Sequence, residues 1–386
     1  MIIKKYNRLL ICFFSFFPLF ILKKGSHFYT YFSTCNIMQM NHSTLILAER
    51  SVVPTLDLIR IQFVRKLPLI FTIIGSIGFI GNVFTFLQPT LRKNTFCIYS
   101  LIGSAFDMLN LYVNLLPNYI YDTDNFLLLI VGTGPCRWKL FGLVVIPQMS
   151  LNLLILSLID RYSCTCSLTS PFRKMRELKN IPYFMIITTI LSSVMSLYAP
   201  LLYEYAPGFG CVPTDTLMNG ISYVSIQGFL TPLVMLVFVC LTFRNVKQSR
   251  HRVVSIFLWL SPIKKRIFLS IQGNTRNTAA QRARYQFINT VFAQVIVTGF
   301  FLLQWMGIYL YHTTTFYSNR TEEQWAIHYF IFGLMNTFYY MINIKSFYLS
   351  TLTSRLFRET LIKSILKMFG KITGQLSVVT KTQTVS

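Results

Sequence analysis

The sequence predicts an all-α membrane protein, namely a bundle of seven transmembrane helices followed by a short amphipathic helix on the cytoplasmic side. First, 53% of the 386 residues are hydrophobic, and the mean hydropathy is +0.51. Second, only 12% of the residues are charged, about half of the roughly 25% usual in globular chains. Third, the chain contains seven apolar windows that are long enough to cross about 30 Å of hydrocarbon, which takes about 20 residues in a helix.

The charge balance by itself would suit a nucleic-acid-binding protein. The chain has 36 Lys+Arg against 12 Asp+Glu, a formal net charge of +24. Such a binder carries its basic clusters on otherwise polar elements, and disordered chains combine high charge with low hydrophobicity. The positive mean hydropathy argues against both classes. Basic loops between membrane spans fit instead, so we expect membrane lipid, and no nucleic acid, as a partner.

Seven windows account for the predicted spans, and charged or turn-forming residues bound them at nearly every end. Within them, Asp107 is the only acid, lysine or arginine. The windows are 67–87, 96–121, 140–159, 181–203, 221–243, 287–311 and 326–344.

Three other apolar stretches compete with these windows. Residues 9–22 are short and lie between basic residues, so a signal-peptide core or an artefact of the gene's start is favoured over a span. Residues 126–131 are too short to cross. Residues 253–271 contain Pro262 and a basic triplet, which favours an apolar insert in a cytoplasmic loop.

These limits give three regions. An extracellular segment covers 1–66, of which 1–39 is signal-like or a misassigned start. The seven-helix domain covers 67–350, and the amphipathic helix with a cytoplasmic tail covers 351–386.

The positions of the charges predict the orientation, because short cytoplasmic loops retain Lys and Arg. With the amino end outside, 24 of the 36 basic residues fall on inner segments and eight of the 12 acids on outer ones. The two Asn-x-Ser/Thr sequons, Asn41 and Asn319, both fall outside, where glycosylation is possible. We therefore expect a multi-pass protein of the plasma membrane with an extracellular amino terminus.

Cysteines give an independent check on this topology. Cys136 lies at the start of the third span, and Cys211 lies in the outer loop at 204–218. Both are on the oxidising side, where a disulfide can persist. The alternative is that these two cysteines are unrelated. Cys164 and Cys166 fall on the reducing side and are expected to remain thiols.

Together these features resemble the rhodopsin-like (class A) G-protein-coupled receptor family, as a divergent member of invertebrate type similar to orphan and peptide receptors. The motifs are Cys136 at the outer end of helix three and Asp160-Arg161-Tyr162 at its inner end. Cys136 and Arg161 are 25 residues apart, about 37 Å along a helix, which places them on opposite faces of the bilayer.

Further matches to the family lie in the other helices. Gly81-Asn82-Val83 resembles its helix-one motif, and the remaining equivalents are Asp107, Pro232, Trp305 and Asn343. Departures accompany them. Ile344 and Lys345 follow Asn343 in place of proline, Phe347 or Tyr348 must replace a tyrosine, and Gly307 follows Trp305 where the family has proline.

The resemblance implies a role for each motif. Arg161, paired with Asp160, would face a heterotrimeric G protein once the inner helix ends open; the alternative is a basic helix end that reaches the interface. Asp107, with Asn82 and Asn343, would form a polar centre that holds an allosteric sodium ion; the alternative is a structural acid without an ion. Trp305 would be a switch beneath the ligand, although aromatic residues on such helices more often pack.

The extracellular ligand is less specified. Leu143 stands where amine receptors carry an aspartate, and the only lysine of helix seven, Lys345, is expected at the cytosolic end, so an amine receptor and an opsin are disfavoured. Acids at the outer rim would steer a cationic, neuropeptide-like ligand, or they collect there only because basic residues stay inside. The rim acids are Asp122, Asp124, Glu204, Asp215, Glu322 and Glu323.

We compare three functional classes: a receptor, a transporter or channel, and an enzyme. A receptor is favoured, and a transporter or channel of seven spans is the alternative. A transporter should show paired midplane charges and interrupted helices, and the windows contain only Asp107. The five histidines are scattered without metal-ligand spacing and no Gly-x-Ser-x-Gly is present, so neither a metal site nor an enzyme is expected.

Overall fold

The computed structural model describes residues 53–89, 91–92, 94–117, 119, 133–166, 177–206, 210–259, 275–315 and 319–367. Side chains at 249–259 and 275–285 are not described. The sequon at Asn41, the stretch 9–22, most of the apolar insert and the rim acids Asp122 and Asp124 lie outside this part of the chain.

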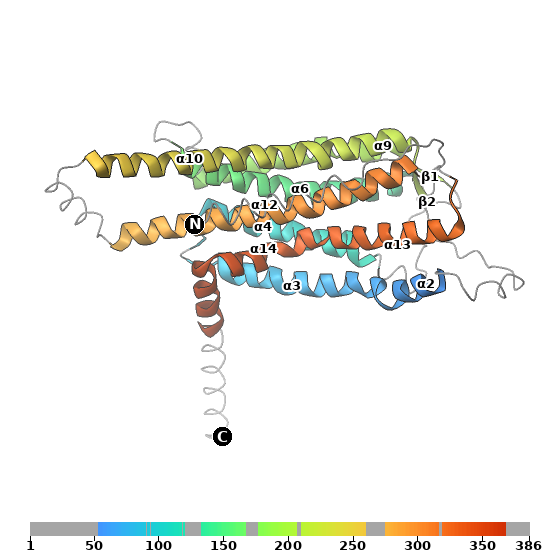
Figure 1. Ribbon diagram of the computed structural model, residues 1–386, viewed down its shortest axis with the longest axis horizontal. Coiled ribbons are helices and arrows are strands. Elements are labelled where there is room, and N and C mark those ends of the chain that lie inside the picture. Colours follow the sequence, from blue (N-terminus) through green and yellow to red (C-terminus); the bar gives the residue numbers. More distant parts are fainter. Residues whose placement is uncertain are drawn as a thin grey trace, which may run out of the picture.

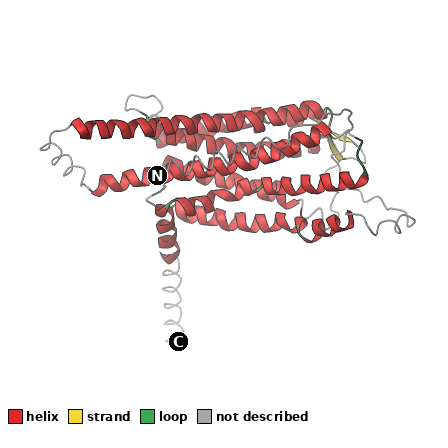
Figure 2. Cartoon of the chain, in the orientation of Figure 1, coloured by secondary structure: helices red, strands yellow, loops and turns green. Residues whose placement is uncertain are grey.

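The described residues form helices almost throughout, with one pair of short strands (Figure 2). In chain order the elements are α2 (Val53–Gln62), η4 (Val64–Lys66), α3 (Leu67–Phe86), α4 (Thr95–Asn110), η5 (Leu111–Leu115), α6 (Thr133–Thr165), η7 (Leu178–Asn180), α7 (Ile181–Met195), α8 (Tyr198–Leu202), β1 (Tyr203–Ala206), β2 (Gly210–Pro213), α9 (Thr216–Tyr223), η8 (Val224–Leu230), α10 (Thr231–Trp259), α12 (Thr275–Thr315), α13 (Glu322–Tyr339) and α14 (Met341–Thr353). A last helix covers 355–367.

The long helices run side by side along one axis (Figure 1). Antiparallel strands β1 and β2 pair at one end of the bundle, with Tyr205 opposite Cys211. We call this the hairpin end. At the opposite end, the tail end, the helix at 355–367 turns away from the bundle (Figure 1).

Within the described residues, six helical segments are long and apolar enough to cross a membrane. They are Leu58–Phe86, Thr95–Leu115, Gly134–Thr165, Leu178–Leu202, Thr216–Gln248 and Gln286–Thr315. The chain is therefore an all-α, multi-pass membrane protein. Seven spans are not confirmed, because the window at 326–344 is divided at Tyr340 into α13 and α14, and neither part qualifies alone.

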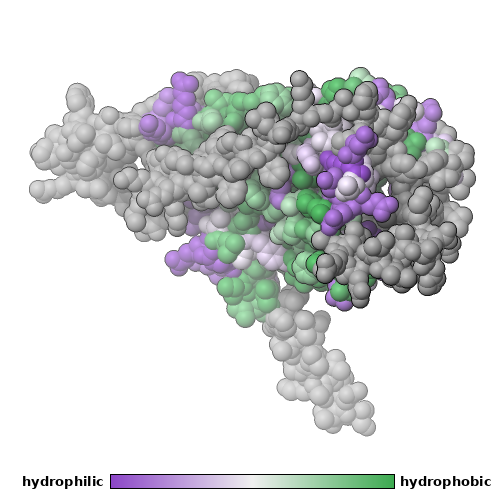
Figure 3. All heavy atoms as spheres, turned by 45° about the vertical axis from the view of Figure 1, so that its right-hand side comes forward, coloured by the Kyte–Doolittle hydropathy of each residue, from purple (hydrophilic) through white to green (hydrophobic). Residues whose placement is uncertain are grey.

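Apolar side chains point outward along these segments, as lipid requires. On α7, Ile186, Ile190 and Val194 are each more than half exposed, whereas soluble proteins rarely expose contiguous apolar patches of this extent. In the coloured part of the face in Figure 3, hydrophobic side chains lie between hydrophilic patches. Polar residues are also buried between the helices, beside an apolar core.

Local signals explain where several helices begin. The Asn94 side chain accepts a hydrogen bond from the Phe96 amide at the start of α4, and Asp215 accepts one from Met218 at the start of α9. Thr321 opens α13 with a reciprocal capping box. Side-chain oxygens at such positions satisfy amides that have no partner within the helix.

Glycines on one face of α3 let α14 approach closely. A methyl group at Gly81 would meet the Phe347 ring, and one at Gly78 would lie 3.3 Å from the Phe347 β-carbon. Beside them, the Tyr348 hydroxyl donates to the Ile74 carbonyl at 3.0 Å. Phe347 and Tyr348, the two candidates for the family's tyrosine, both therefore fix α14 against α3.

The predicted amphipathic helix, 354–368, corresponds to the helix at 355–367. Ser354 caps its first turn by accepting from the Phe357 amide at 3.2 Å. Gln286 of α12 accepts from the Leu356 amide at 3.0 Å. Phe357 is buried against Phe86 with ring centroids 5.4 Å apart, so the helix is anchored to the tail end.

Replacing Gly81 with alanine should destabilise the protein, because the new methyl group collides with the Phe347 ring. Overpacking of this kind costs about 1–3 kcal/mol. Gly142→Ala is the matched control, since its added carbon meets no atom within 4 Å and alanine is favoured in helices by up to about 1 kcal/mol. Thermal unfolding in detergent should show a lower midpoint only for Gly81→Ala, and equal shifts for both would contradict this packing.

Candidate functional site

Buried polar residues lie at three levels along α6, which runs the length of the bundle. Its tail end carries Asp160 and Arg161, its middle carries Ser150, and its hairpin half contributes Leu143 and Pro147 to a cavity. Since α6 contacts α4, α10 and α7 closely, side chains on this one helix reach most of the other spans.

At the tail end, Arg161 is almost completely enclosed, with its side chain 4% exposed. It forms an ion pair with Asp160, and its Nε donates to an Asp160 oxygen at 3.0 Å. Its Nη2 also donates to the Asn94 Oδ1 at 3.0 Å. A buried guanidinium needs such partners, because an unpaired ion away from water is strongly unfavourable.

Neighbouring helices complete the enclosure of this pair. The guanidinium lies over the Phe96 ring at 4.7 Å and near the Phe287 ring of α12 at 5.7 Å. Thr95 donates to the second Asp160 oxygen. The arginine is therefore held inside between α4, α6 and α12, and it does not extend to the interface as a free basic helix end.

Tyr162 faces a different neighbour from Arg161. Its ring lies 5.9 Å from that of Phe238 on α10. Nearby, Asn245 donates to Thr165 at 3.3 Å and to Cys166 at 3.7 Å. The three-residue motif thus joins α6 to α4 and α12 on one side and to α10 on the other.

At the middle level, Asp107 is 5% exposed and accepts a hydrogen bond from Ser150. It lines a cavity of about 30 Å³ that also holds side chains of Gln294 and Lys345. The expectation that Lys345 lies at the cytosolic end is wrong. Its side chain is buried at the level of Asp107, because α14 begins after the break at Tyr340 and enters the bundle here.

Asn82, Asp107 and Asn343, which the sequence predicted to form one polar cluster, do not hydrogen-bond one another among the described residues. Asn343 accepts from Asn110 at 3.1 Å, and the buried Asn82 oxygen has no hydrogen-bond partner among the described residues. Asp107 bonds Ser150 instead. The three predicted residues lie inside the bundle, but no direct hydrogen bond connects them in the part of the chain described.

A sodium ion does not fit this set of residues. Sodium needs several oxygen ligands around an uncompensated negative charge, and Asp107 supplies that charge. The Lys345 ammonium lines the same small cavity and interacts with Asp107 electrostatically. Among the described residues that line this cavity, Lys345 is the only one that carries a positive charge.

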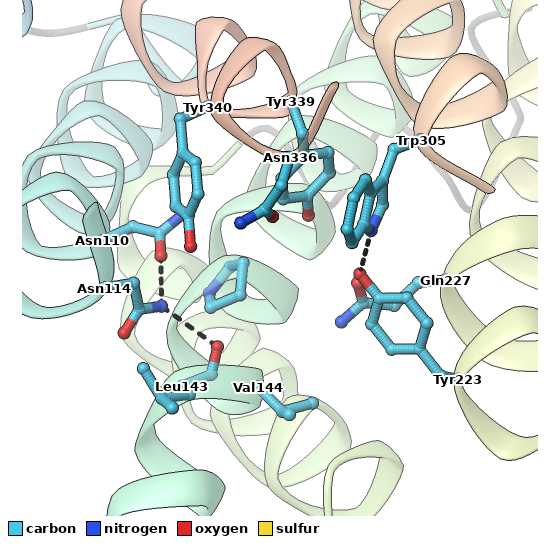
Figure 4. Close-up of a pocket in the computed structure, with 11 residues that line it drawn as sticks. Asn110, Asn114, Leu143, Val144, Tyr223, Gln227, Trp305, Asn336, Tyr339 and Tyr340 are labelled. Atoms are coloured by element: carbon cyan, nitrogen blue, oxygen red, sulfur yellow. Dashed lines mark hydrogen bonds between the residues drawn. The ribbon is translucent and has the colours of Figure 1, made fainter. Parts of the chain in front are cut away.

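In the hairpin half, a cavity of about 80 Å³ is lined by eleven residues (Figure 4). Asn110 and Asn114 lie on one side of it, and Trp305 and Tyr223 on the opposite side, with the space between them. The lining residues are Asn110, Asn114, Leu143, Val144, Pro147, Tyr223, Gln227, Trp305, Asn336, Tyr339 and Tyr340. None of these side chains is an acid, a lysine, an arginine or a histidine.

Two carbonyl oxygens at this cavity lack a partner in the structure. They belong to Asn114 and Gln227, whose side chains are 6% and 1% exposed. The Asn114 amide nitrogen is already used, since it donates to Asn110 and, at 3.1 Å, to the Leu143 carbonyl. Because buried polar atoms are normally paired, the cavity is suited to a group that donates hydrogen bonds.

Trp305 lies at the wall of the cavity. Its indole nitrogen donates to the Tyr223 hydroxyl at 2.8 Å, and its ring is 5.2 Å from Phe332. Tyr223 comes directly before η8, a π-helical stretch, and Pro232 follows it. Proline has no amide hydrogen to donate to the preceding turn, and such wide turns often mark functional sites.

The hairpin end is closed by a disulfide. Cys136 of α6 and Cys211 of β2 are bonded, with their Cα atoms 5.6 Å apart, as the sequence predicts. Beside it, Arg137 donates to the Tyr203 carbonyl at 3.1 Å and pairs with Glu204 at 3.2 Å. The end of α6 that leads to the cavity is therefore tied to the β1–β2 hairpin.

The rim acids that the structure describes also have local roles. Glu204 pairs with Arg137, and Asp215 caps α9. Glu322 and Glu323 are exposed in the first turn of α13, where acids stabilise a helix amino terminus. Asn319 is exposed just before α13, so its sequon is accessible.

Neither a scan against protein-family models nor a search of curated proteins finds a match to this chain. The class of protein must therefore be argued from the geometry of its own residues. The sequence patterns did not indicate several contributors to the site, namely Asn94, Thr95, Phe96, Asn110, Asn114, Ser150, Tyr223, Gln227 and Phe287. Only Asn94 had a local signal, as a helix-capping residue after a basic turn.

Replacing Tyr223 with phenylalanine should destabilise the bundle, because the buried Trp305 nitrogen loses its acceptor. An unsatisfied buried donor costs about 1–3 kcal/mol. Tyr309→Phe is the matched control, since that ring is 5.9 Å from Trp305 and the change keeps the indole bond. Thermal unfolding in detergent measures both, and an equal loss in the two variants would show that the bond to the indole contributes nothing.

Proposed function

We propose that the protein is a G-protein-coupled receptor of the rhodopsin-like type. It has seven spans, with α13 and α14 together forming the last. It binds an extracellular ligand at the hairpin end and activates a heterotrimeric G protein at the tail end. The amino terminus is extracellular, the membrane is the plasma membrane, and Asn41 and Asn319 are available for glycosylation.

The observation that carries this proposal is the enclosure of Arg161. A cation that served only to anchor a helix end would extend to the lipid headgroups. Here the guanidinium is paired with Asp160 and covered by Phe96 and Phe287, so it becomes accessible only if α12 moves away from α6. Such a contained ion pair is suited to a switch that an opening movement releases.

A path of contacts supports coupling between the two ends. Asn114, at the cavity, donates to Asn110, and Asn110 donates to Asn343 on α14 at 3.1 Å. On the other side, Tyr223 links the cavity to Trp305 on α12, the helix that covers Arg161 with Phe287. A ligand that pairs with the Asn114 oxygen or displaces Tyr223 would therefore bias the helices that enclose Arg161.

The cavity also limits the chemistry of the ligand. About 80 Å³ is far below the about 300–1,000 Å³ of typical ligand pockets, so only a terminal group enters. The unpaired oxygens of Asn114 and Gln227 favour an uncharged donor such as a carboxamide or hydroxyl. A cationic part of a neuropeptide-like ligand would remain near the rim, where Glu322 and Glu323 are exposed.

A transporter or channel is the alternative. The break between α13 and α14 and the presence of both Asp107 and Lys345 at one depth are features that transporters share. Many transporters are also built from inverted repeats, and no feature of the described elements indicates one. The receptor is therefore favoured.

Arg161→Ala should abolish G-protein activation while the protein still reaches the cell surface. The assay expresses the full chain with a panel of G proteins and applies a peptide library that includes amidated peptides. Arg355→Ala is the control, because that arginine is exposed at the same end and, among the described residues, pairs with Glu359. We expect the response to fall to the background of untransfected cells in Arg161→Ala and to remain in Arg355→Ala.

The opposite pattern would exclude this mechanism. If Arg161→Ala signalled as the wild type does, Arg161 would have no role in activation. If no peptide produced a response through any G protein and the wild type carried a constitutive ion flux, the transporter or channel would replace the receptor.

Neutralising the rim should weaken a cationic agonist. The double variant Glu322→Gln and Glu323→Gln is expected to lower its potency several-fold at low ionic strength, because the attraction is long-range. At about 1 M salt, where the screening length is about 3 Å, the difference should disappear. Glu359→Gln at the tail end is the charge-matched control, and unchanged potency at every salt concentration would disprove steering.

A further inference from the structure

The cavity at Asp107 contains an unusual pair of residues. Lys345 lies on α14 and is 9% exposed, and Asp107 lies on α4 and is 5% exposed. Both line the same cavity of about 30 Å³, which is wide enough for one or two water molecules. The other lining groups with hydrogen-bonding side chains are neutral, and they include Ser100, Ser104 and Gln294.

The opposite charges of Lys345 and Asp107 attract each other across this cavity. Lys345 attracts Asp107 electrostatically, and the reverse attraction acts on Lys345. They form no direct ion pair within 4.0 Å, since the described ion pairs involve other residues. Their hydrogen bonds go instead to Ser150, which donates to Asp107, and to the Ile342 carbonyl, which accepts from the Lys345 Nζ at 2.6 Å.

Burial makes compensation of these charges necessary. An isolated ion inside a membrane protein is costly, and acids and bases there usually face one another or a water-filled cavity. Lys345 and Asp107 are the only acid and base that line this cavity. A second cation beside the ammonium would be repelled by it and would find the carboxylate already compensated.

We infer that the Lys345 ammonium is the resident counter-ion of Asp107, and that it takes the place of a sodium ion at this level of the bundle. The cavity is therefore a cation site whose occupant is part of the chain. Lys345 has this role whether or not the protein signals through a G protein.

The position of Lys345 adds a mechanical consequence. It follows the break at Tyr340, and its nitrogen bonds the Ile342 carbonyl in the first turn of α14. A shift of α14 therefore moves the ammonium relative to Asp107 on α4 and Ser150 on α6. A free ion could follow the carboxylate, whereas this cation can move only with its helix.

The test uses the full-length protein in detergent and measures its thermal midpoint in NaCl and in choline chloride at equal ionic strength. We expect no sodium-specific shift in the wild type. Lys345→Met leaves Asp107 uncompensated, so it should unfold several degrees lower in choline and gain a saturable, sodium-specific rise in midpoint. Lys345→Arg keeps a cation and should stay insensitive to sodium.

A double variant separates the charge from the shape of the cavity. Asp107→Asn combined with Lys345→Met removes both charges, so the sodium response should vanish. The double variant should also be more stable in choline than Lys345→Met alone, because no uncompensated carboxylate remains.

Two results would overturn the inference. One is a sodium-specific stabilisation of the wild type that Asp107→Asn abolishes, and the other is a Lys345→Met protein that ignores sodium. If Lys345→Met fails to fold, Lys345→Gln is measured in the same way. If neither folds in any salt, recovery of folding on adding Asp107→Asn supports the inference, and failure to recover contradicts it.

Discussion

The need to satisfy polar groups away from water governs this bundle. Its outer face is apolar, so the guanidinium of Arg161 and the carboxylate of Asp107 cannot be solvated from the lipid side. The counter-ion of Arg161, Asp160, lies on the same helix, whereas the other groups around both charges come from other helices. Arg161 draws in Asn94 and the rings of Phe96 and Phe287, and Asp107 draws in Ser150 and Lys345. Contacts that neutralise charge therefore also hold the helices together.

The two charged levels and the neutral cavity lie at different depths along α6. At the hairpin end this helix is fixed by the disulfide between Cys136 and Cys211, and at the tail end it carries the enclosed Arg161. The cavity between them is lined by amides and phenols and has unpaired oxygens on Asn114 and Gln227. The cavity and the enclosed Arg161 both contact α4 and α12, so a change in the cavity can act on Arg161 through these two helices.

Features that depend on local pattern could be predicted from the sequence. Helical, apolar segments follow from hydropathy, and six of them are present. The disulfide followed from the position of two cysteines on one side of the membrane. The helix at 355–367 followed from apolar residues on one side of a helix with basic residues elsewhere. Asp160 and Arg161 are adjacent, so their pairing was also a local property.

Apart from the disulfide, the contacts between residues distant in the sequence could not be predicted. Thr95 meets Asp160 across 65 residues of sequence, and Tyr223 meets Trp305 across 82. Lys345 was expected at the cytosolic end because it directly follows the window 326–344, but its side chain lines the cavity at Asp107. The break at Tyr340 explains why the seventh window does not form a single long helix.

The central claim is that the enclosed Arg161 holds the tail ends of α6 and α12 together. The most direct measurement is the distance distribution between spin labels on the tail-end halves of these two helices, compared between the wild type and Asp160→Asn. The account predicts one short distance in the wild type and a second, longer population in the variant, because the guanidinium loses its counter-ion. Identical distributions in the two proteins would contradict it.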